Sequence, residues 1–197
     1  VGPVPYDGDD QTMQDGFVIR AEKAPNTRGV RRVLDSFGGP VLEASGFEAA
    51  LRKDDSIVGV LLTGNYPSQW VTPQFREAIG EGRFVVMLDT LPNSLTERSN
   101  VLLPAATWME KSGTFENADH RLQSFQQAVH PAKWCKSEAQ IAIDLLSQLR
   151  GEKPSVYCDA QTRVAMAEAG LPEMLHDVTH PRQEDVQTDS DMHLIVL

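Results

Sequence analysis

Cysteine is scarce in this chain, which limits the redox cofactors that it could hold by itself. Only Cys135 and Cys158 occur among the 197 residues. Two thiols are too few for a disulfide scaffold, an all-cysteine zinc site or an iron–sulfur cluster, which needs about four thiolates. The cysteine content therefore fits a reduced, cytoplasmic setting and excludes a self-contained cluster.

The sequence also lacks long apolar runs and an excess of basic residues. No run approaches the roughly 18 to 20 residues of a membrane span, and residues 1–10 lack the basic and apolar regions of an export signal. The 28 acidic and 18 basic side chains give a formal net charge of -10, the wrong sign for a phosphate backbone bound through Lys and Arg. Nucleic acid and direct membrane insertion are therefore not expected.

What the chain does contain is a pattern of buried strands. Hydrophobic residues make up 41% of it, enough to bury a core. The continuous apolar runs Ile57–Leu62 and Phe84–Leu88 are typical of parallel strands covered on both faces. Thr72-Pro73 between them has the features of a helix start. We therefore expect a βαβ unit, followed by a shorter strand at Asn100–Leu103.

Further helices and strands flank this unit. We expect strands at Phe17–Ile19 and Arg121–Val129, and a helix at Asp159–Ala169 closed by Gly170. Caps or capping boxes predict three more helices, at Asn26, at Ser45 with Glu48, and at Ser137 with Gln140. The last of these helices should end near Gly151.

These elements divide the chain into three parts. We expect an irregular lead-in at 1–16, an α/β domain at 17–151 and a helical, acidic C-terminal extension at 152–197. Residues 151–197 carry 9 acidic and 3 basic side chains. We expect the acidic stretch Glu184–Asp191 to be an exposed loop.

No catalytic or metal-binding arrangement is apparent in the sequence. The five histidines lack the spacing of metal ligands, and although His176 and His180 are four residues apart, Pro181 follows directly and no third ligand is apparent. Cys135 has no histidine that can be assigned as its partner, so we expect a half-buried thiol. Phosphate-binding motifs of the Walker A and GxGxxG types are absent.

Two loops at strand ends are the candidates for a binding site. Gly64 and Asn65 follow the first apolar run, and Asp89 and Thr90 follow the second. Ligands of open α/β sheets bind at such carboxyl ends, where a glycine lets a backbone N–H approach a phosphate. The Asp89 carboxylate could accept paired N–H bonds from a guanine edge, each worth about 1.5–3 kcal/mol. Ordinary turns explain the same residues, and spacing alone does not decide.

The order of motifs from Leu61 to Arg150 resembles the molybdopterin oxidoreductase family. Sequences of that family have the following motifs in this order. A strand ends in Gly-x-Asn-Pro, and a second strand ends in Asp. The segments Ala-Asp-Val-Val-Leu-Pro and Glu-x-x-Gly-Thr-x-x-Asn follow, and the second of these is followed by Arg-x-Gln. The matching stretches here are LLTGNYP, FVVMLDT, SNVLLP, and EKSGTFEN followed by Arg121 and Gln123. Upstream, Lys23–Gly29 resembles the Pro-Asn-x-x-Gly segment of one branch of the family, the G-type subunits of NADH-quinone oxidoreductase, which favours that branch over formate dehydrogenase.

This resemblance implies a doubly wound α/β domain, with a mainly parallel sheet and helices on both faces. In the family's enzymes such a domain helps to hold one guanosine of a bis-molybdopterin guanine dinucleotide. By position, Gly64 and Asn65 match the phosphate-side loop, and Asp89, with Thr90 beside it, matches the guanine-reading carboxylate. Glu110, Gly113, Thr114 and Asn117 are best interpreted as fold residues: Gly113 should form a turn, Thr114 and Asn117 should satisfy backbone groups, and Arg121 should pair with Glu110. We expect Trp70, Trp108 and Trp134 to be packing or interface residues.

Three departures bear on whether a nucleotide binds. Tyr66 is inserted between asparagine and proline, and Ser99 and Asn100 replace alanine and aspartate. The leading hypothesis is therefore a non-catalytic domain of a G-type subunit of NADH-quinone oxidoreductase (complex I), which supports electron transfer from NADH to quinone. Its partners would be other domains of the same subunit and other respiratory-complex subunits, on the cytoplasmic side and peripheral to the inner membrane. The segment itself would hold no cofactor, and the iron–sulfur clusters would lie elsewhere in the parent subunit.

Two alternatives stay open. The first is the domain of a molybdenum enzyme, such as a formate dehydrogenase, that clamps molybdopterin guanine dinucleotide through the loops at Gly64 and Asp89. The second is a free-standing interaction protein that reuses the fold and turns its acidic C-terminal stretch toward a basic partner.

Overall fold

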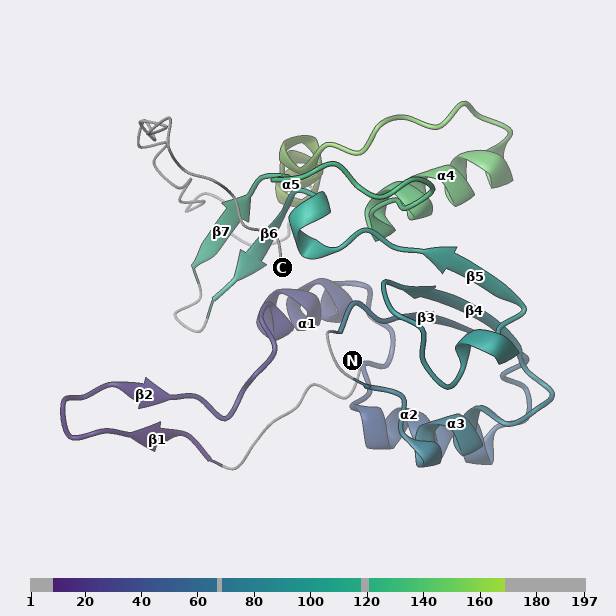
Figure 1. The fold of residues 1–197 in the computed structure, drawn as a ribbon, viewed down its shortest axis with the longest axis horizontal. Coiled ribbons are helices and arrows are strands. Elements are labelled where there is room, and N and C mark those ends of the chain that lie inside the picture. Colours follow the sequence, from purple (N-terminus) through teal and green to yellow (C-terminus); the bar gives the residue numbers. More distant parts are fainter. Residues whose placement is uncertain (1–8, 67–68, 118–120, 169–197) are drawn as a thin grey trace, which may run out of the picture.

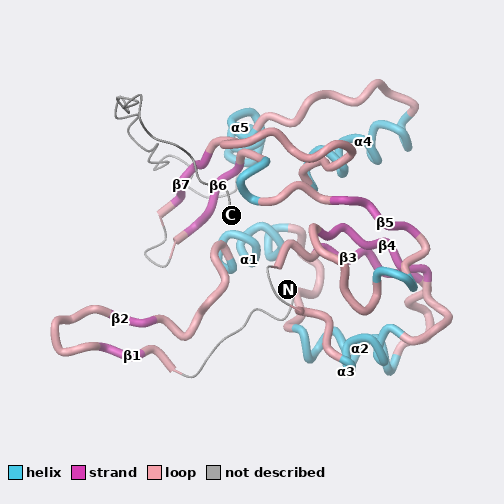
Figure 2. The backbone as a smooth tube through the Cα atoms, viewed as in Figure 1, coloured by secondary structure: helices cyan, strands magenta, loops and turns pink. Residues whose placement is uncertain are grey.

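The computed structural model describes residues 9–66, 69–117 and 121–168, and its largest sheet is parallel and lies at the right of the view (Figures 1 and 2). The strands are β1 Gln11–Thr12, β2 Val18–Ile19, β3 Gly59–Thr63, β4 Phe84–Asp89, β5 Val101–Pro104, β6 Gly113–Glu116 and β7 Leu122–Phe125. The helices are α1 Thr27–Ser36, α2 Ala44–Lys53, α3 Pro73–Ile79, α4 Glu138–Arg150 and α5 Asp159–Glu168, with 3-10 turns η1 Thr96–Arg98 and η2 Trp108–Glu110.

The largest sheet consists of β3, β4 and β5, in that order and all parallel. Leu61 pairs with Val86, which in turn pairs with Val101, so one row of side chains crosses all three strands. Helix α3 connects β3 to β4, which is the βαβ unit expected from the two apolar runs. The predicted α/β class is confirmed, with a parallel sheet flanked by helices.

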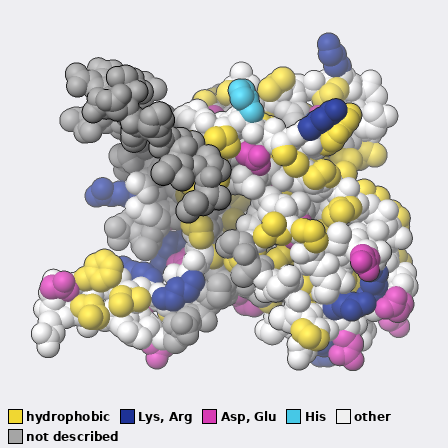
Figure 3. Space-filling model, in the orientation of Figure 1, with side chains coloured by type: hydrophobic (Ala, Val, Ile, Leu, Met, Phe, Trp, Pro, Cys, Tyr) yellow, Lys and Arg dark blue, Asp and Glu magenta, His cyan; other side chains and the backbone are white. Residues whose placement is uncertain are grey.

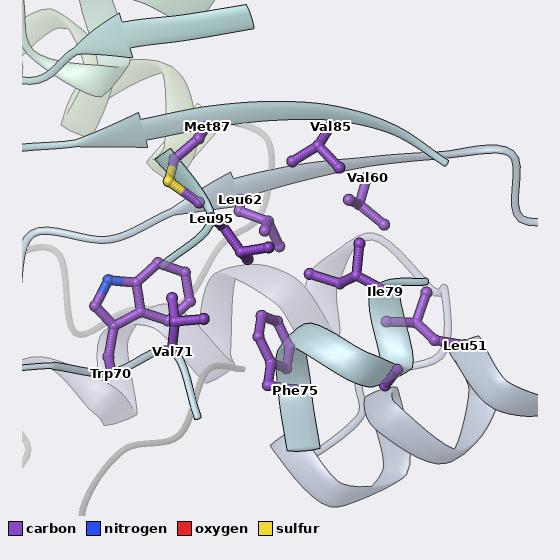
Figure 4. Close-up of a cluster of buried hydrophobic side chains, with 11 residues drawn as sticks. Leu51, Val60, Leu62, Trp70, Val71, Phe75, Ile79, Val85, Met87 and Leu95 are labelled. Atoms are coloured by element: carbon purple, nitrogen blue, oxygen red, sulfur yellow. The ribbon is translucent and has the colours of Figure 1, made fainter. Parts of the chain in front are cut away.

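One face of this sheet forms the hydrophobic core with α2 and α3 (Figure 4). Alternation along the strands turns Val60 and Leu62 of β3, and Val85 and Met87 of β4, to the same face. The side chains that meet them are Leu51, Phe75, Ala78, Ile79 and Leu95. Burying an aliphatic or aromatic side chain of this size stabilises the fold by about 1.5–3 kcal/mol, so this cluster is the main apolar contribution to stability.

Two predicted helix caps are confirmed by the hydrogen bonds at their helix ends. The Thr72 hydroxyl accepts the Phe75 N–H at 3.1 Å, and the Ser137 hydroxyl accepts the Gln140 N–H at 3.2 Å. Each bond satisfies one of the N–H groups that a helix start leaves without an internal partner. Gly151 ends α4 in the left-handed conformation, with φ 68°, as expected of a glycine at that position.

At two other helix starts the predicted helix is present, but the predicted side-chain cap is not. Helix α2 begins at Ala44 with Glu43 in the cap position, so Ser45 lies inside the helix rather than before it. Asn26 does precede α1, but its backbone is left-handed and its side chain makes no capping bond. Its Oδ1 accepts the backbone N–H of Glu116 at 2.9 Å instead. The Asn26 side chain therefore forms a long-range hydrogen bond to β6 instead of the cap that its position before the helix predicted.

The hairpin β6–β7 also differs from the expectation. Gly113, expected to form a turn, lies in β6 opposite Phe125, and the strand expected at Arg121–Val129 is confined to Leu122–Phe125. A Cβ atom on Gly113 would lie 2.8 Å from the Phe125 ring. The glycine thus leaves room for an aromatic ring to pack against the strand and does not form a turn. The rings of Phe115 and Phe125 also pack against each other in a tilted arrangement, with centroids 4.8 Å apart and planes at 58°.

A short antiparallel pair precedes the sheet. β1 and β2 pair through Gln11 with Ile19 and Thr12 with Val18. The expected strand at Phe17–Ile19 is thus present as β2, and its partner lies in the segment expected to be irregular. The expected Gly170 cap, the acidic stretch 184–191 and the histidines at 120, 176, 180 and 193 lie outside the described residues. Within the described ranges, no helix is long and apolar enough to span a bilayer.

The ion pair between Arg32 of α1 and Glu116 of β6 provides a test of how the hairpin is held. Both Glu116 oxygens accept from the guanidinium, at 2.6 and 2.8 Å, and the Glu116 side chain is fully buried. The same bonds raise the pKa of Arg32. Glu116→Gln replaces one of the two acceptors of the Arg32 guanidinium, which is itself one-third exposed, and we therefore expect it to lower the free energy of unfolding by about 1–3 kcal/mol in urea denaturation.

The matched control is Glu43→Gln, which removes the partner of Arg31 in an exposed ion pair. Exposed pairs contribute at most about 1 kcal/mol, so this variant should unfold at nearly the wild-type urea concentration. Equal losses in the two variants would contradict a special role for the Arg32–Glu116 pair.

Candidate functional site

The carboxyl ends of β3 and β4 meet in one place, and they bring the four sequence-derived candidates together. The Gly64 N–H donates to the Leu88 carbonyl at 2.7 Å, which continues the β3–β4 ladder past the last residue of β3. The next residue, Asn65, donates its N–H to Asp89 Oδ1 at 2.9 Å. Gly64, Asn65, Asp89 and Thr90 therefore line one junction, as expected from parallel neighbouring strands.

The Asp89 carboxylate is the centre of this junction, and the chain itself occupies it. Oδ1 accepts the N–H groups of Asn65 at 2.9 Å and Thr90 at 2.7 Å. Oδ2 accepts the Trp70 indole N–H at 2.8 Å and the Asn93 amide at 2.9 Å. The side chain is buried, with 7% of Asp89 exposed. Four donors on two oxygens use about the full hydrogen-bonding capacity of a carboxylate.

Gly64 is required by the closeness of this carboxylate. A Cβ atom on Gly64 would lie 2.2 Å from the Asp89 carboxyl carbon, well inside any van der Waals contact. Asn65 follows in the left-handed conformation, with φ 73°, which asparagine tolerates better than most residues. Its side-chain Oδ1 is buried and has no hydrogen-bond partner among the described residues. The loop is thus shaped around Asp89 and leaves one amide oxygen without a partner.

A hollow of about 290 Å³ lies beside the carboxylate. It is lined by Tyr66, Gln69, Trp70, Asp89, Leu91, Pro92 and Asn93. Tyr66 packs against the hydrophobic core, and burial raises the pKa of its hydroxyl, so the ring is held neutral. The insertion of Tyr66 between asparagine and proline therefore has a packing reason in this chain.

The arrangement does not fit a guanosine as it stands. A guanine edge donates to a carboxylate that has free acceptor capacity, and a phosphate accepts from free backbone N–H groups. Here the Asp89 oxygens are bound by four donors, the Gly64 N–H is bound by Leu88 and the Asn65 N–H by Asp89. A nucleotide would have to displace Trp70 and Asn93 before it could use the carboxylate.

Two partners of Asp89 were not predicted as site residues. Trp70 was expected to be a packing or interface residue, and it is buried, but its indole N–H also needs an acceptor. Asn93 donates to Asp89 and accepts the Leu95 N–H at 2.8 Å, a local Asx turn. The sequence signal for Asn93 was its place in a Pro-Asn-Ser turn, which points to a turn and not to its long-range partner.

The residues grouped around Glu110 have fold roles that differ in detail from the expected ones. Glu110 accepts the Thr107 N–H at 2.8 Å and the Ala132 N–H at 3.0 Å, so the expected pairing with Arg121 is wrong. These bonds, that from the Thr107 backbone above all, lower the pKa of Glu110. Asn117 does satisfy a backbone group, since its Oδ1 accepts the Arg121 N–H at 2.9 Å.

A second hollow lies away from this junction, between α1, the β6–β7 hairpin and α5. Its volume is about 310 Å³, and the surface that lines it is mostly apolar. The charged side chains in it pair with one another, Arg32 with Glu116 and Arg163 with Asp159, and Arg163 also donates to the Thr114 hydroxyl. No group of three or more potential metal ligands occurs among the residues placed in the structure, and Cys135 and Cys158 are both free thiols of intermediate burial.

Comparison with known proteins gives the same family as the motif order. A family model described as molybdopterin oxidoreductase matches residues 45–148. A nitrate reductase of Symbiobacterium thermophilum is 33% identical over 69 residues, which are 35% of this chain and 9% of that protein. An NADH-quinone oxidoreductase G subunit of Streptomyces coelicolor is 36% identical over 74 residues, 38% of this chain and 9% of that protein. The matched stretch thus spans about a tenth of each curated relative.

The first test of the junction is Gly64→Ala. The added methyl group would collide with the Asp89 carboxylate and push it from its donors, so we expect the free energy of unfolding to fall by about 2 kcal/mol or more. Gly39→Ala is the control, because a Cβ atom there meets nothing within 4 Å. Urea denaturation of both variants measures the difference, and an equal stability of the two would rule out the close approach.

The second test is Asp89→Asn, which keeps the size of the side chain but turns one acceptor into a donor. Two of the four buried donors then lose their acceptor, at about 1–3 kcal/mol each. We expect a loss of about 2–5 kcal/mol in urea denaturation together with a change in the fluorescence of Trp70. Asp55→Asn, at an exposed position, should change neither. A variant Asp89→Asn as stable as Asp55→Asn would contradict the central role of the carboxylate.

Proposed function

Because the chain belongs to the molybdopterin oxidoreductase family, we propose that it forms a non-catalytic α/β domain of a larger oxidoreductase chain, the G-type subunit of an NADH-quinone oxidoreductase. The observation that carries the proposal is the occupied carboxylate of Asp89. A residue that would read a guanine edge is used to hold two loops and an indole ring. The domain then contributes structure rather than a nucleotide site.

The departures from the family pattern support the same role. Asn100 replaces an aspartate, and its Oδ1 accepts the Val85 N–H at 2.7 Å, which ties the start of β5 to β4. Tyr66, the inserted residue, packs against the core. Both residues have a structural use within the sheet and its loops. The Pro-Asn-x-x-Gly segment at residues 25–29 and the similarity to the Streptomyces protein favour the NADH-quinone oxidoreductase branch.

In this role the domain supports the transfer of electrons from NADH to quinone without holding a redox centre. Other domains of the same subunit and other respiratory-complex subunits are its partners, at the cytoplasmic face and peripheral to the inner membrane. Iron–sulfur clusters belong to the parent subunit outside this segment. The proposed division of the chain is a lead-in at 1–16, the α/β domain at 17–151 and a C-terminal extension at 152–197.

A second candidate function is the clamping of a molybdopterin guanine dinucleotide. It is favoured by the hollow beside Asp89 and by the unpartnered Oδ1 of Asn65, which a ligand could satisfy. The residues that would hold the guanosine are Gly64, Asn65, Asp89 and Thr90. Binding would require Trp70 and Asn93 to release Asp89, and the hydrogen bonds lost would offset those gained.

A titration with GDP separates the two functions. Amide chemical shifts of Gly64, Asn65 and Thr90 report on the junction, and the Trp70 indole N–H reports on the release of Asp89. For the structural domain we expect no saturable shift at millimolar GDP. Saturable binding at micromolar GDP with movement of the Trp70 signal would overturn the proposal and favour the clamp. ADP serves as the control, because its base lacks the paired donors that a carboxylate reads.

A further inference from the structure

The parallel sheet has a second face that the described chain leaves partly uncovered. The side chains that point away from α2 and α3 include Leu61, Phe84 and Val101, which are 62%, 53% and 36% exposed. With the half-buried Val86 they form one surface, because Val86 pairs with Leu61 on one side and Val101 on the other. We call these four residues the open face.

Helix α4 leaves a second apolar surface exposed on the side of the sheet away from α2 and α3 (Figure 1). Leu145, Leu146 and Leu149 are 48%, 50% and 84% exposed, and Ala142 is exposed as well. Their spacing of i, i+3, i+4 and i+7 puts them on one stripe of the helix. Hydrophobic side chains gather on the visible face of the molecule in the region of α4 and the strands (Figure 3).

An open face of this kind is unusual for a parallel sheet. Parallel sheets occur almost only with both faces covered, because their crossover connections place helices on them. The other face follows this rule, since α2 and α3 bury Val60, Leu62, Val85 and Met87. None of the residues of β3, β4 and β5 whose side chains point to this side is charged, and one of them, Leu88, is already buried by the described chain. Exposure of this apolar surface to water is therefore unfavourable.

We propose that the open face is the docking surface for an amphipathic helix with an aliphatic stripe, contributed by another part of the larger oxidoreductase chain. A helix is the occupant because helices, not sheets, cover parallel strands. The absence of charge on the face excludes an occupant held by ion pairs. The matched stretch is 9% of each curated relative, which leaves ample chain for the covering element. This inference rests on the proposed function.

Assembly of a substituted chain tests the proposal. Leu61→Glu puts a charge in the open face, and because Leu61 is already 62% exposed we expect the melting temperature of the full chain to change by less than about 2 °C. In native gels of the tagged, full-length parent assembly, we expect at least a tenfold loss of assembled protein. Val58→Glu is the matched control: Val58 is 76% exposed, and strand alternation directs it to the other side of the sheet. It should assemble as the wild type does.

A photo-crosslinking residue at position 61 identifies the occupant. The expected adduct joins position 61 to a segment of the same oxidoreductase chain with apolar residues at i, i+3, i+4 and i+7. An adduct to α4 of a second copy would overturn the proposal in favour of self-association. Normal assembly of Leu61→Glu would also overturn it while leaving the proposed function intact. If the unsubstituted chain enters no oxidoreductase assembly, the proposed function itself fails, and this inference fails with it.

Discussion

The carboxylate of Asp89 is the interaction on which the junction of loops at the sheet depends. It ends β4, and through four hydrogen bonds it fixes the loop after β3, the Trp70 ring and the turn at Asn93. These groups are 1 to 24 residues away along the chain, so one side chain holds together segments that no local preference would align. Since Trp70 also belongs to the hydrophobic core, the polar junction and the apolar cluster share a member.

This use of Asp89 links the fold to the functional conclusion. A buried carboxylate without donors would be costly, so the chain must satisfy it either with its own N–H groups or with a ligand. Here the chain supplies all four donors. In the proposed function, the carboxylate that the family resemblance assigns to guanine recognition stabilises the fold instead, and a nucleotide would have to compete with the four donors that already bind it.

Local patterns in the sequence predicted the elements that local physics controls. The apolar runs predicted β3 and β4. Thr72 and Ser137 cap their helices because, at the N-cap position, the hydroxyl lies within reach of the backbone N–H three residues on. Long-range partners were not predictable in this way. Asn26 precedes α1, but its side chain does not cap the helix because it accepts the backbone N–H of Glu116, 90 residues later. The convergence of Gly64 and Asp89 followed from strand parallelism, but the donors Trp70 and Asn93 depend on tertiary folding.

The apolar pattern of β3 and β4 also indicates how much of the sheet should be covered. A continuous apolar run, unlike an alternating one, is the pattern of a strand buried on both sides. β3 and β4 have this pattern, yet within the described chain α2 and α3 fully bury only one of their faces. The sequence is therefore adapted to more cover than these residues provide. Because Leu61 and Phe84 contribute little to the core while exposed, their apolar character is best explained by a neighbour that packs on them.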